Sequence, residues 1–300
     1  MALDVICVGV VTVDTITTIE RMPAEDDRVL GDPFVVAGGG PAATAAVALA
    51  RLGASVGFCG VVGDDDAGKL SRRLLEDEGV DTRWLRTRPD VRTPQSMIMV
   101  SRASGSRSIV TSPSVSPDPG SVPTRASRWL HVDQTGYDSV RAALRGGSDE
   151  VSLSIDGGNP IPRLDLRDVD LYSPTVGSLR AAFPAEDVTG SLRAAAAGAR
   201  RVVATAGGEG CEVLVNDRVV HVPPVTVDPV STMGAGDVFH GALLAGLVEG
   251  RSLVEAAWRA NVVAALSCRA LDGRSGIPDA AETEKYLSTV RPAPWIDEYA

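Results

Sequence analysis

Short apolar runs alternate with amphipathic segments in the N-terminal part of the chain. The run Val5–Val11 is apolar and rich in β-branched residues, and Ser55–Val62 has a similar pattern, so both are predicted to be buried strands. Between them, a Gly-Gly-Gly-Pro turn leads into an alanine-rich helix that is expected to end at Leu52, just before Gly53. A second helix is predicted over about Ala67–Glu78, because its leucines fall on one face. This order of elements predicts a parallel sheet covered by helices on both sides.

Two further extended segments interrupt the alternation. Residues Thr93–Val100 and Arg107–Thr111 flank a Ser-Gly-Ser turn and are predicted to form a hairpin. Together with Thr15–Val36, they are expected to form a small separate sheet. No shift in composition marks a linker, and no internal repeat is evident. Residues 1–300 are therefore predicted to form one doubly wound α/β domain, with a small β-sheet built from insertions at about 15–36 and 93–111.

The remainder of the chain resumes the alternation and then becomes helical. A second hairpin is predicted with its turn at Asn216-Asp217. The expected strands are Trp129–Val132, Val151–Ile155, Asp170–Tyr172, Arg201–Thr205, Glu212–Val215 and Val219–Val222. Three helices are expected here. The first begins at about Gly234, the second spans Leu253–Ala270, and the third spans about Ala280–Val290.

The charge balance bears on the possible binding partners, and the cysteines bear on the cellular compartment. The 29 Lys and Arg residues and the 39 Asp and Glu residues give a net charge of −10, which argues against binding to nucleic acid or to anionic membranes. The four cysteines lie far apart in apolar stretches and are predicted to be reduced core residues of a cytoplasmic protein. Asp4 stands where a signal peptide needs positive charge, and Arg51 interrupts the nearly uncharged segment 35–62. Neither an export signal nor a membrane span is expected.

Two glycine-rich segments match nucleotide-binding motifs only in spacing. Gly38–Ala43 fits G-x-G-x-x-A, but about 25 residues separate it from the first strand, and Pro41 removes an amide. Gly63–Leu70 resembles a phosphate-binding loop, but its three aspartates would repel phosphate, so helix capping is the better interpretation. Asp156 ends a predicted strand and is left unassigned.

The segment around Asp237 is the strongest candidate for chemistry. Gly234, Ala235 and Gly236 stand where an apolar helix is predicted to begin, so their amides are expected to form an anion pocket without cationic side chains. Asp237 follows in the first turn, where its carboxylate can accept a proton from a substrate hydroxyl. A tight turn followed by an ordinary first-turn acid is the alternative interpretation, and the spacing alone does not decide between them.

Taken together, these segments resemble the ribokinase-like carbohydrate kinases, also called the PfkB family, over nearly the whole chain. The similarity of Thr232–Asp237 to the C-terminal signature of the family is the most specific match. The other matching segments are Gly39–Thr44 with Ala50–Ala54 (the N-terminal signature), Val62–Gly68 (an acidic turn) and Gly273–Pro278 (the closing motif).

The resemblance implies a role for each matching residue. It implies that Asp237 is the catalytic base and that Gly234, Ala235 and Gly236 form the anion hole for the γ-phosphate. The remaining implied contacts are Asp14, Gly39, Gly40 and Thr44 for the sugar, and Thr205, Gly207, Gly210 and Asn261 for the nucleotide. The small β-sheet corresponds to the lid of the family, which closes over the sugar, excludes water and often pairs two subunits. ATP, Mg²⁺, a small sugar and a homodimer formed through the lid are therefore expected.

Three positions depart from the pattern of the family. The Asn-x-x-Glu motif that organises magnesium and phosphate aligns with Thr175 and Ser178, which leaves the metal ligands unassigned. Ser231 replaces an acid that helps many members to bind a monovalent cation, so activation by potassium is not expected. Thr44 replaces the usual Asn of the N-terminal signature, so a ribose substrate does not follow.

Within the family, the two signature segments are most similar to those of sulfofructose kinases and related ketose kinases. Where that branch places the Asn and Arg that contact the sulfonate, this chain has Thr111 and, approximately, Thr135, so the substrate does not follow from the branch. Arg28 and Arg107 are candidates for contacting an anionic group of the substrate, and solvated lid charges are the alternative interpretation.

The leading hypothesis is an ATP-dependent kinase that phosphorylates a hydroxyl of a small sugar or sugar-like polyol. A sugar-binding or nucleotide-binding protein of the same fold, with weakened catalysis, is the first alternative, because the Asn-x-x-Glu motif is missing. A nucleoside kinase is the second, because it would use the same chemistry on another acceptor.

Overall fold

The fold is organised around a six-stranded parallel sheet, with strand order β10-β9-β8-β1-β4-β5. The computed structural model describes residues 2–104, 106–145 and 151–290. The central strands are β1 (Leu3–Val8), β4 (Val56–Gly63), β5 (Asp81–Arg88), β8 (Ser127–Val132), β9 (Ser152–Gly157) and β10 (Leu171–Pro174). The predicted α/β class is confirmed.

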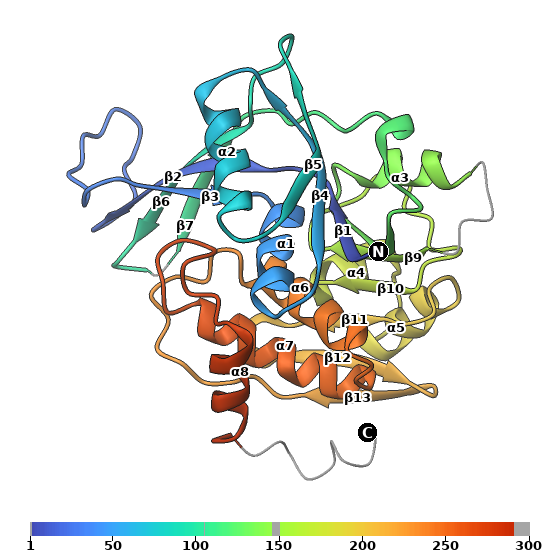
Figure 1. The fold of residues 1–300 in the computed structure, drawn as a ribbon. Coiled ribbons are helices and arrows are strands. Elements are labelled where there is room, and N and C mark those ends of the chain that lie inside the picture. The colour runs from blue at the N-terminus through green and yellow to red at the C-terminus, as the bar shows by residue number, and fades with distance from the viewer. Residues whose placement is uncertain (1, 105, 146–150, 291–300) are drawn as a thin grey trace.

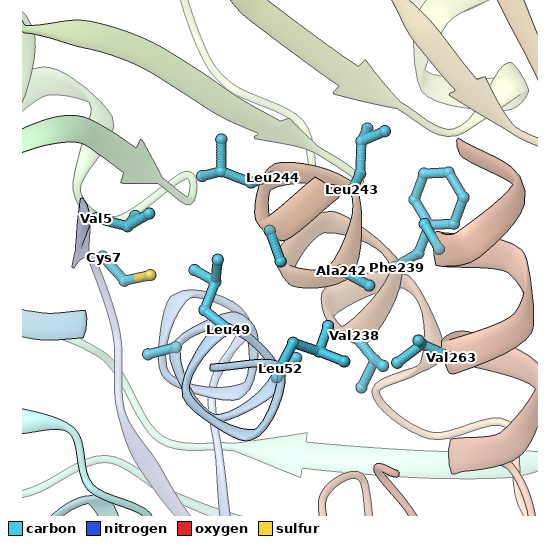
Figure 2. Packing of buried hydrophobic residues seen from close by; sticks show 14 of the residues in the cluster. Val5, Cys7, Leu49, Leu52, Val238, Phe239, Ala242, Leu243, Leu244 and Val263 are labelled. Carbon is cyan, nitrogen blue, oxygen red and sulfur yellow. The ribbon is translucent and has the colours of Figure 1, made fainter. Parts of the chain in front are cut away.

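Helices cover both faces of this sheet, as the alternation of elements predicted (Figure 1). Successive side chains of β1 point to opposite faces, so that Val5 and Cys7 pack with α1, α6 and α7, whereas Ile6 and Val8 pack with α3, α4 and α5. The first of these two cores is drawn in Figure 2. The helices are α1 (Pro41–Arg51), α2 (Asp66–Glu76), α3 (Tyr137–Leu144), α4 (Val176–Ala182), α5 (Val188–Ala196), α6 (Ala235–Val248), α7 (Leu253–Ser267) and α8 (Ala280–Leu287). Among the described residues, no helix combines the length and apolar character that crossing a membrane requires.

A four-stranded sheet, called the lid from here on, extends to one side of the core (Figure 1). Its strand order is β3-β2-β6-β7, with β2 and β6 parallel and both outer pairs antiparallel. The strands are β2 (Thr12–Ile19), β3 (Val35–Gly39), β6 (Gln95–Ser101) and β7 (Arg107–Thr111). A separate small sheet was expected and is confirmed, whereas the division of the chain into one domain with two lid insertions stays a prediction.

A three-stranded antiparallel sheet lies beyond β10. It consists of β11 (Val203–Thr205), β12 (Cys211–Val215) and β13 (Arg218–Val222). Isolated bridges from Tyr172 to Val202 and from Thr175 to Thr205 connect it to the central sheet. The predicted hairpin turn is present, with φ values of 49° and 64° at Asn216 and Asp217, as a two-residue hairpin requires.

Several elements differ from the sequence-based expectation. Strand β5 was missed because three arginines interrupt its apolar pattern, as is common for an edge strand that faces solvent. The predicted strand Val5–Val11 ends at Val8, because the chain turns away at Gly9, where a Cβ would lie 2.2 Å from the carboxylate of Asp133. Helices α3, α4 and α5 contain only eight, seven and nine residues, which is too short for a clear helical period.

Candidate active site

A cavity of about 470 Å³ lies at the carboxyl ends of the central strands, between the lid and the start of α6. Most of the residues with predicted roles line it, namely Asp14, Gly39, Gly40, Thr44, Arg107, Thr205, Gly234, Gly236 and Asp237. The predicted residues that are not among the lining residues are Arg28, Ala235, Gly207, Gly210 and Asn261. Segments that are far apart in the sequence therefore meet at one site.

The start of α6 lies at the cavity, where Gly234 and Gly236 are lining residues. The amide of Ala235, in contrast, donates to the carbonyl oxygen of Thr232 at 3.4 Å. Gly234 is the N-cap in the left-handed conformation, with φ 71°, and no side chain caps this end of the helix. A Cβ at Gly234 would lie 3.0 Å from the Cα of Gly273, so a larger residue would be both strained and crowded. Uncapped amides at the positive end of a helix dipole favour an anion.

Asp237 lies in the first turn of α6 and lines the cavity. Its surroundings raise the pKa of its carboxyl to about 7, chiefly because burial disfavours the charged form. The carboxylates of Asp156 and Asp133 raise this pKa further, whereas His240 and Arg274 lower it. A carboxyl with a pKa near neutrality exchanges protons readily at physiological pH.

Asp156 and His240 form a buried ion pair beside Asp237. The Nδ1 of His240 lies 3.0 Å from the Oδ2 of Asp156, and the side chains are only 3% and 2% exposed. One oxygen or nitrogen from each of Asp156, Asp237 and His240 lies within 4.8 Å of the others. The pair raises the pKa of His240 and lowers that of Asp156, against the effect of burial on each. The sequence pattern predicted no role for Asp156 or for His240, which lies three residues after Asp237.

Asp133 holds the backbone around the cavity through four hydrogen bonds. Its Oδ2 accepts from the amides of Val10 at 2.9 Å and Ala42 at 3.3 Å. Its Oδ1 accepts from the amides of Thr135 at 2.8 Å and Gly136 at 3.0 Å. Burial raises the pKa of Asp133 to about 6. This carboxylate therefore joins the β1–β2 connection to the starts of α1 and α3.

The wall formed by the lid carries the predicted sugar contacts. Thr12 donates a hydrogen bond from Oγ1 to the Oδ1 of Asp14 at 2.7 Å, which orients this buried carboxylate. A Cβ at Gly39 would lie 2.0 Å from the Oδ2 of Asp14, so only glycine leaves this carboxylate its place. Gly40 has φ 92°, and a Cβ there would lie 2.4 Å from the carbonyl oxygen of Val10. Asp14, Gly39 and Gly40 thus form one continuous surface of the cavity.

Arg274 is a buried residue of the closing motif that forms hydrogen bonds with this wall of the cavity. Its Nη2 donates to the carbonyl oxygen of Gly39 at 2.7 Å, and its Nε donates to the Oγ1 of Thr44 at 3.3 Å. Burial lowers its pKa to about 10. Arg51 in turn donates from Nη1 to the carbonyl oxygens of Arg274 and Ile277. Arg274 belongs to the closing motif, but the sequence pattern predicted no role for this residue.

The two lid arginines lie in different environments. Arg107 of β7 lines the cavity and donates a hydrogen bond from Nη1 to the Oγ1 of Thr232 at 2.9 Å. Arg28 is exposed on the connection between β2 and β3 and is not a lining residue. The structure therefore brings Arg107, and not Arg28, to the cavity.

The predicted nucleotide-binding residues are only partly gathered at the cavity. Thr205 lines it at the end of β11. Gly207 and Gly210 flank the following turn with φ values of 59° and 89°. The side-chain amide of Asn261 on α7 donates to the carbonyl oxygens of Val222 at 3.2 Å and Pro223 at 2.9 Å. Asn261 thus supports the backbone that leaves β13, and its expected role at adenine stays a prediction.

Comparison with known families decides the classification. The model of the pfkB family of carbohydrate kinases matches residues 2–122 and 161–280, which include the lid, the start of α6 and the closing motif. The chain belongs to the pfkB family. The family predicted from the signature segments is therefore confirmed, and with it the expected class of enzyme, a sugar kinase.

Relatives of this pfkB protein share its length as well as its sequence pattern. Ribokinase from Bacillus subtilis is 28% identical over 297 residues, which cover 94% of this chain and 99% of that relative. Aminoimidazole riboside kinase from Salmonella typhimurium is 29% identical over 305 residues, covering 91% and 93% of the two chains. The structure of Arabidopsis thaliana ribokinase complexed with ribose and ATP superposes with a TM-score of 0.81 at 25% identity, covering 96% and 99%. The expected likeness to sulfofructose kinases stays a prediction.

Two departures from the pfkB pattern have a structural explanation. Thr175 is the N-cap of α4, where its Oγ1 accepts from the amide of Ser178 at 3.0 Å and donates to the Oγ of Ser178 at 2.9 Å. Ser178 donates in turn to the carbonyl oxygen of Gly158. These uncharged hydroxyls satisfy one another, so the two positions do not fit a Mg²⁺ site, which prefers carboxylates. Ser231 accepts from the amide of Met233 at 3.2 Å and offers no charge for a monovalent cation.

Proposed function

We propose that the protein is an ATP-dependent kinase that phosphorylates a hydroxyl group of a small sugar or sugar-like polyol. One observation carries this proposal. The carboxylate of Asp237 lines the cavity directly after Gly234 and Gly236, at a helix start that no side chain caps, so a base and a candidate anion hole are adjacent. Phosphoryl transfer needs this pair, because a proton leaves the acceptor while negative charge develops on the transferred group.

The proposed acceptor site lies between the lid and the start of α1. There, Asp14 offers a carboxylate that can accept hydrogen bonds from sugar hydroxyls, and Gly39 and Gly40 allow the backbone to approach the sugar ring. The lid covers this side of the cavity and limits the access of water, which would otherwise accept the phosphoryl group. The acceptor would thus be oriented before the nucleotide reacts.

The proposed reaction is a single in-line displacement. The acceptor oxygen forms a bond to the γ-phosphorus of ATP while the bond between this phosphorus and the β,γ-bridging oxygen breaks, and ADP leaves with the electron pair of that bond. The hydroxyl proton passes to the carboxylate of Asp237. The amides of Gly234 and Gly236 stabilise the negative charge on the γ-phosphoryl oxygens, and the amide of Ala235 can join them only by leaving the carbonyl oxygen of Thr232. The pKa of about 7 at Asp237 suits a base that accepts a proton near neutral pH.

The first test is ADP release from ATP across a panel of ketoses, aldoses, sulfonated sugars and nucleosides, in a buffer that contains MgCl₂. Saturable turnover with one acceptor would support the proposal and identify the substrate. Asp237→Asn should then lower kcat by at least about a hundredfold, the usual scale for a lost general base. Asp66→Asn is the matched control, because Asp66 also lies in the first turn of a helix, and its side chain is fully exposed. Near-normal kcat in Asp237→Asn would contradict the proposed role of this carboxylate.

Two alternatives are outcomes of the same panel. Turnover confined to nucleosides would make the protein a nucleoside kinase, a reading favoured by the similarity to aminoimidazole riboside kinase. Saturable binding of sugar or ATP without ADP release from any acceptor would indicate a binding protein with weakened catalysis. The hydroxyl pair of Thr175 and Ser178, in place of the amide and carboxylate of the family, motivates this second alternative.

A further inference from the structure

Two buried carboxylates act electrostatically on Asp237, and one of them, Asp156, lines the cavity with it. Asp133 and Asp156 are 0% and 2% exposed, and both act on Asp237 to raise its pKa. Acids that share a site of low dielectric resist joint ionisation, because each charge repels the others and none is fully hydrated. A catalytic base must nevertheless be ionised to accept a proton. The site therefore needs a compensating positive charge close to Asp237.

His240 is placed to supply that charge. It lies three residues after Asp237 on α6, so the two side chains lie on the same face of the helix. Its Nδ1 is 3.0 Å from the Oδ2 of Asp156, and oxygen or nitrogen atoms of the three residues lie within 4.8 Å of one another. The imidazole thus lies close to two carboxylates, and both favour its charged form.

The other ionisable groups around this cluster do not replace His240. His131 on β8, whose ring centroid is 6.3 Å from that of His240, is neutral near pH 7, because burial lowers its pKa to about 4. Tyr172 on β10 is also uncharged, because burial raises its pKa to about 12. Arg274 lies within electrostatic range of Asp237, but its guanidinium donates hydrogen bonds to the carbonyl oxygen of Gly39 and the hydroxyl of Thr44. Among the described residues, His240 is the one positively charged side chain that forms an ion pair with a carboxylate of this cluster.

We propose that His240 is a positioning residue that Asp156 holds as an imidazolium, and that its positive charge keeps the carboxylate of Asp237 ionised for proton abstraction. This inference rests on the proposed function, because it concerns the base of that reaction. Asp156 anchors the imidazolium from the end of β9, across the cavity floor from α6. The charges of Asp156 and His240 have opposite effects on the pKa of Asp237. Loss of the positive charge of His240 alone would therefore leave the negative charge of Asp156 to raise this pKa.

The pH dependence of kcat tests this role. At low pH, kcat should fall as Asp237 becomes protonated; this fall is called the acid limb. In His240→Gln the midpoint of the acid limb should move to higher pH by about one to three units, because an opposite charge close to Asp237 is lost and Asp156 remains. Activity should recover at high pH, and the acceptor KM should change less than kcat at neutral pH. In the double variant Asp156→Asn with His240→Gln, both charges are removed, so the limb should return toward that of the native protein. An unmoved limb, or a loss of activity that is equal at every pH, would overturn the proposal.

His221→Gln is the matched control for the substitution. His221 pairs with Glu212 on the β12–β13 hairpin, where it is half exposed and is not a lining residue of the cavity, so its replacement should leave the limb unmoved. A shift in this variant equal to that of His240→Gln would also overturn the proposal, since the effect would then not be specific to the cluster.

A second measurement does not depend on turnover or on any variant of His240. The chain has only three histidines, so imidazole nitrogen NMR of histidine-labelled protein can follow each ring, with His221→Gln and His131→Gln used to assign the signals. The ring of His240 should remain protonated at pH 7, whereas that of His131 should be neutral. A neutral His240 at pH 7 would overturn this inference even if the protein phosphorylates a sugar. Absence of ADP release together with a protonated His240 would count against the proposed function alone.

Discussion

Arg107 of the lid donates a hydrogen bond from its Nη1 to the Oγ1 of Thr232, at 2.9 Å, although the two residues are 125 positions apart in the chain. Thr232 lies in the segment that leads into α6, two residues before Gly234. The contact therefore joins the cover of the proposed acceptor site to the loop that presents the anion hole. Both residues line the cavity, so the contact is part of its boundary.

Replacing this arginine should weaken acceptor binding more than chemistry. In Arg107→Gln the acceptor KM should rise by about twofold to tenfold, the net scale of one ordinary hydrogen bond in a protein, while kcat changes little. Steady-state kinetics with the best acceptor of the panel measures both constants. Arg102→Gln is the control, because Arg102 is also a lid arginine but pairs with Asp32 away from the cavity. A fall in kcat at constant KM would show that the contact acts on the transfer step instead.

The activity of the native protein should depend on a single ionisation near pH 7. Because the pKa of Asp237 is raised to about 7, this carboxyl is protonated below that pH and cannot act as a base. The value of kcat/KM should therefore rise about tenfold per pH unit below pH 7 and level off above it. A pH profile with the identified acceptor checks this, and Asp66→Asn should leave it unchanged. A limb near pH 4, as for an exposed aspartate, would contradict the prediction.

A methyl group at Gly39 should damage the acceptor wall. In Gly39→Ala the new Cβ would lie 2.0 Å from the Oδ2 of Asp14 and 2.6 Å from the Oγ1 of Thr12, so the carboxylate must move. We expect the acceptor KM to rise by at least about tenfold while binding of ATP is retained, as measured by kinetics and by calorimetry with ATP. Gly120→Ala is the control, because a Cβ there has open space around it. Equal losses of ATP and acceptor binding would indicate general disruption of the fold.

The outer face of the lid should pair with a second copy of the chain. Val36, Met97 and Val110 are 57%, 59% and 68% exposed, and the strand register places them in one row across the sheet together with Thr15. An exposed apolar row on a sheet favours association. The native protein is therefore expected to be a dimer in light scattering after gel filtration.

A charge in that row should separate the copies. Val110→Glu is expected to give a monomer, because pairing would bury the new carboxylates without a partner. Val230→Glu is the matched control, since Val230 is 58% exposed but lies outside the lid strands. A native protein that is already monomeric, or a Val110→Glu variant that remains dimeric, would contradict this prediction.

Local patterns made much of this fold and part of its site accessible from the sequence. The anion site was predicted from the segment around Asp237 because only the start of one helix is involved. In the structure this helix begins at Ala235, after Gly234 in the left-handed conformation. The signature at Gly39 was equally local. Strand β5 was missed because its three arginines conceal the few buried positions, as described for an edge strand.

The remaining features depend on contacts between distant segments. The pairing of Asp156 with His240 joins residues 84 positions apart, and no spacing rule relates them. The role of Arg274 follows from its burial against Gly39 and Thr44, whereas from composition alone an arginine is expected on the surface. One available signal was the presence of His240 one helical turn after Asp237 in a chain with only three histidines.

The two halves of the cavity come from separable parts of the chain. The lining residues Asp14 and Thr111, on the side of the proposed acceptor site, lie on lid strands, whereas the carboxylate proposed to act as the base belongs to α6. Substitutions in the lid can therefore alter which hydroxyl compound is accepted while leaving the transfer machinery intact. This separation allows one catalytic helix to be retained while acceptor preference diverges, and it makes exchange of the lid strands a direct route to redesigning specificity.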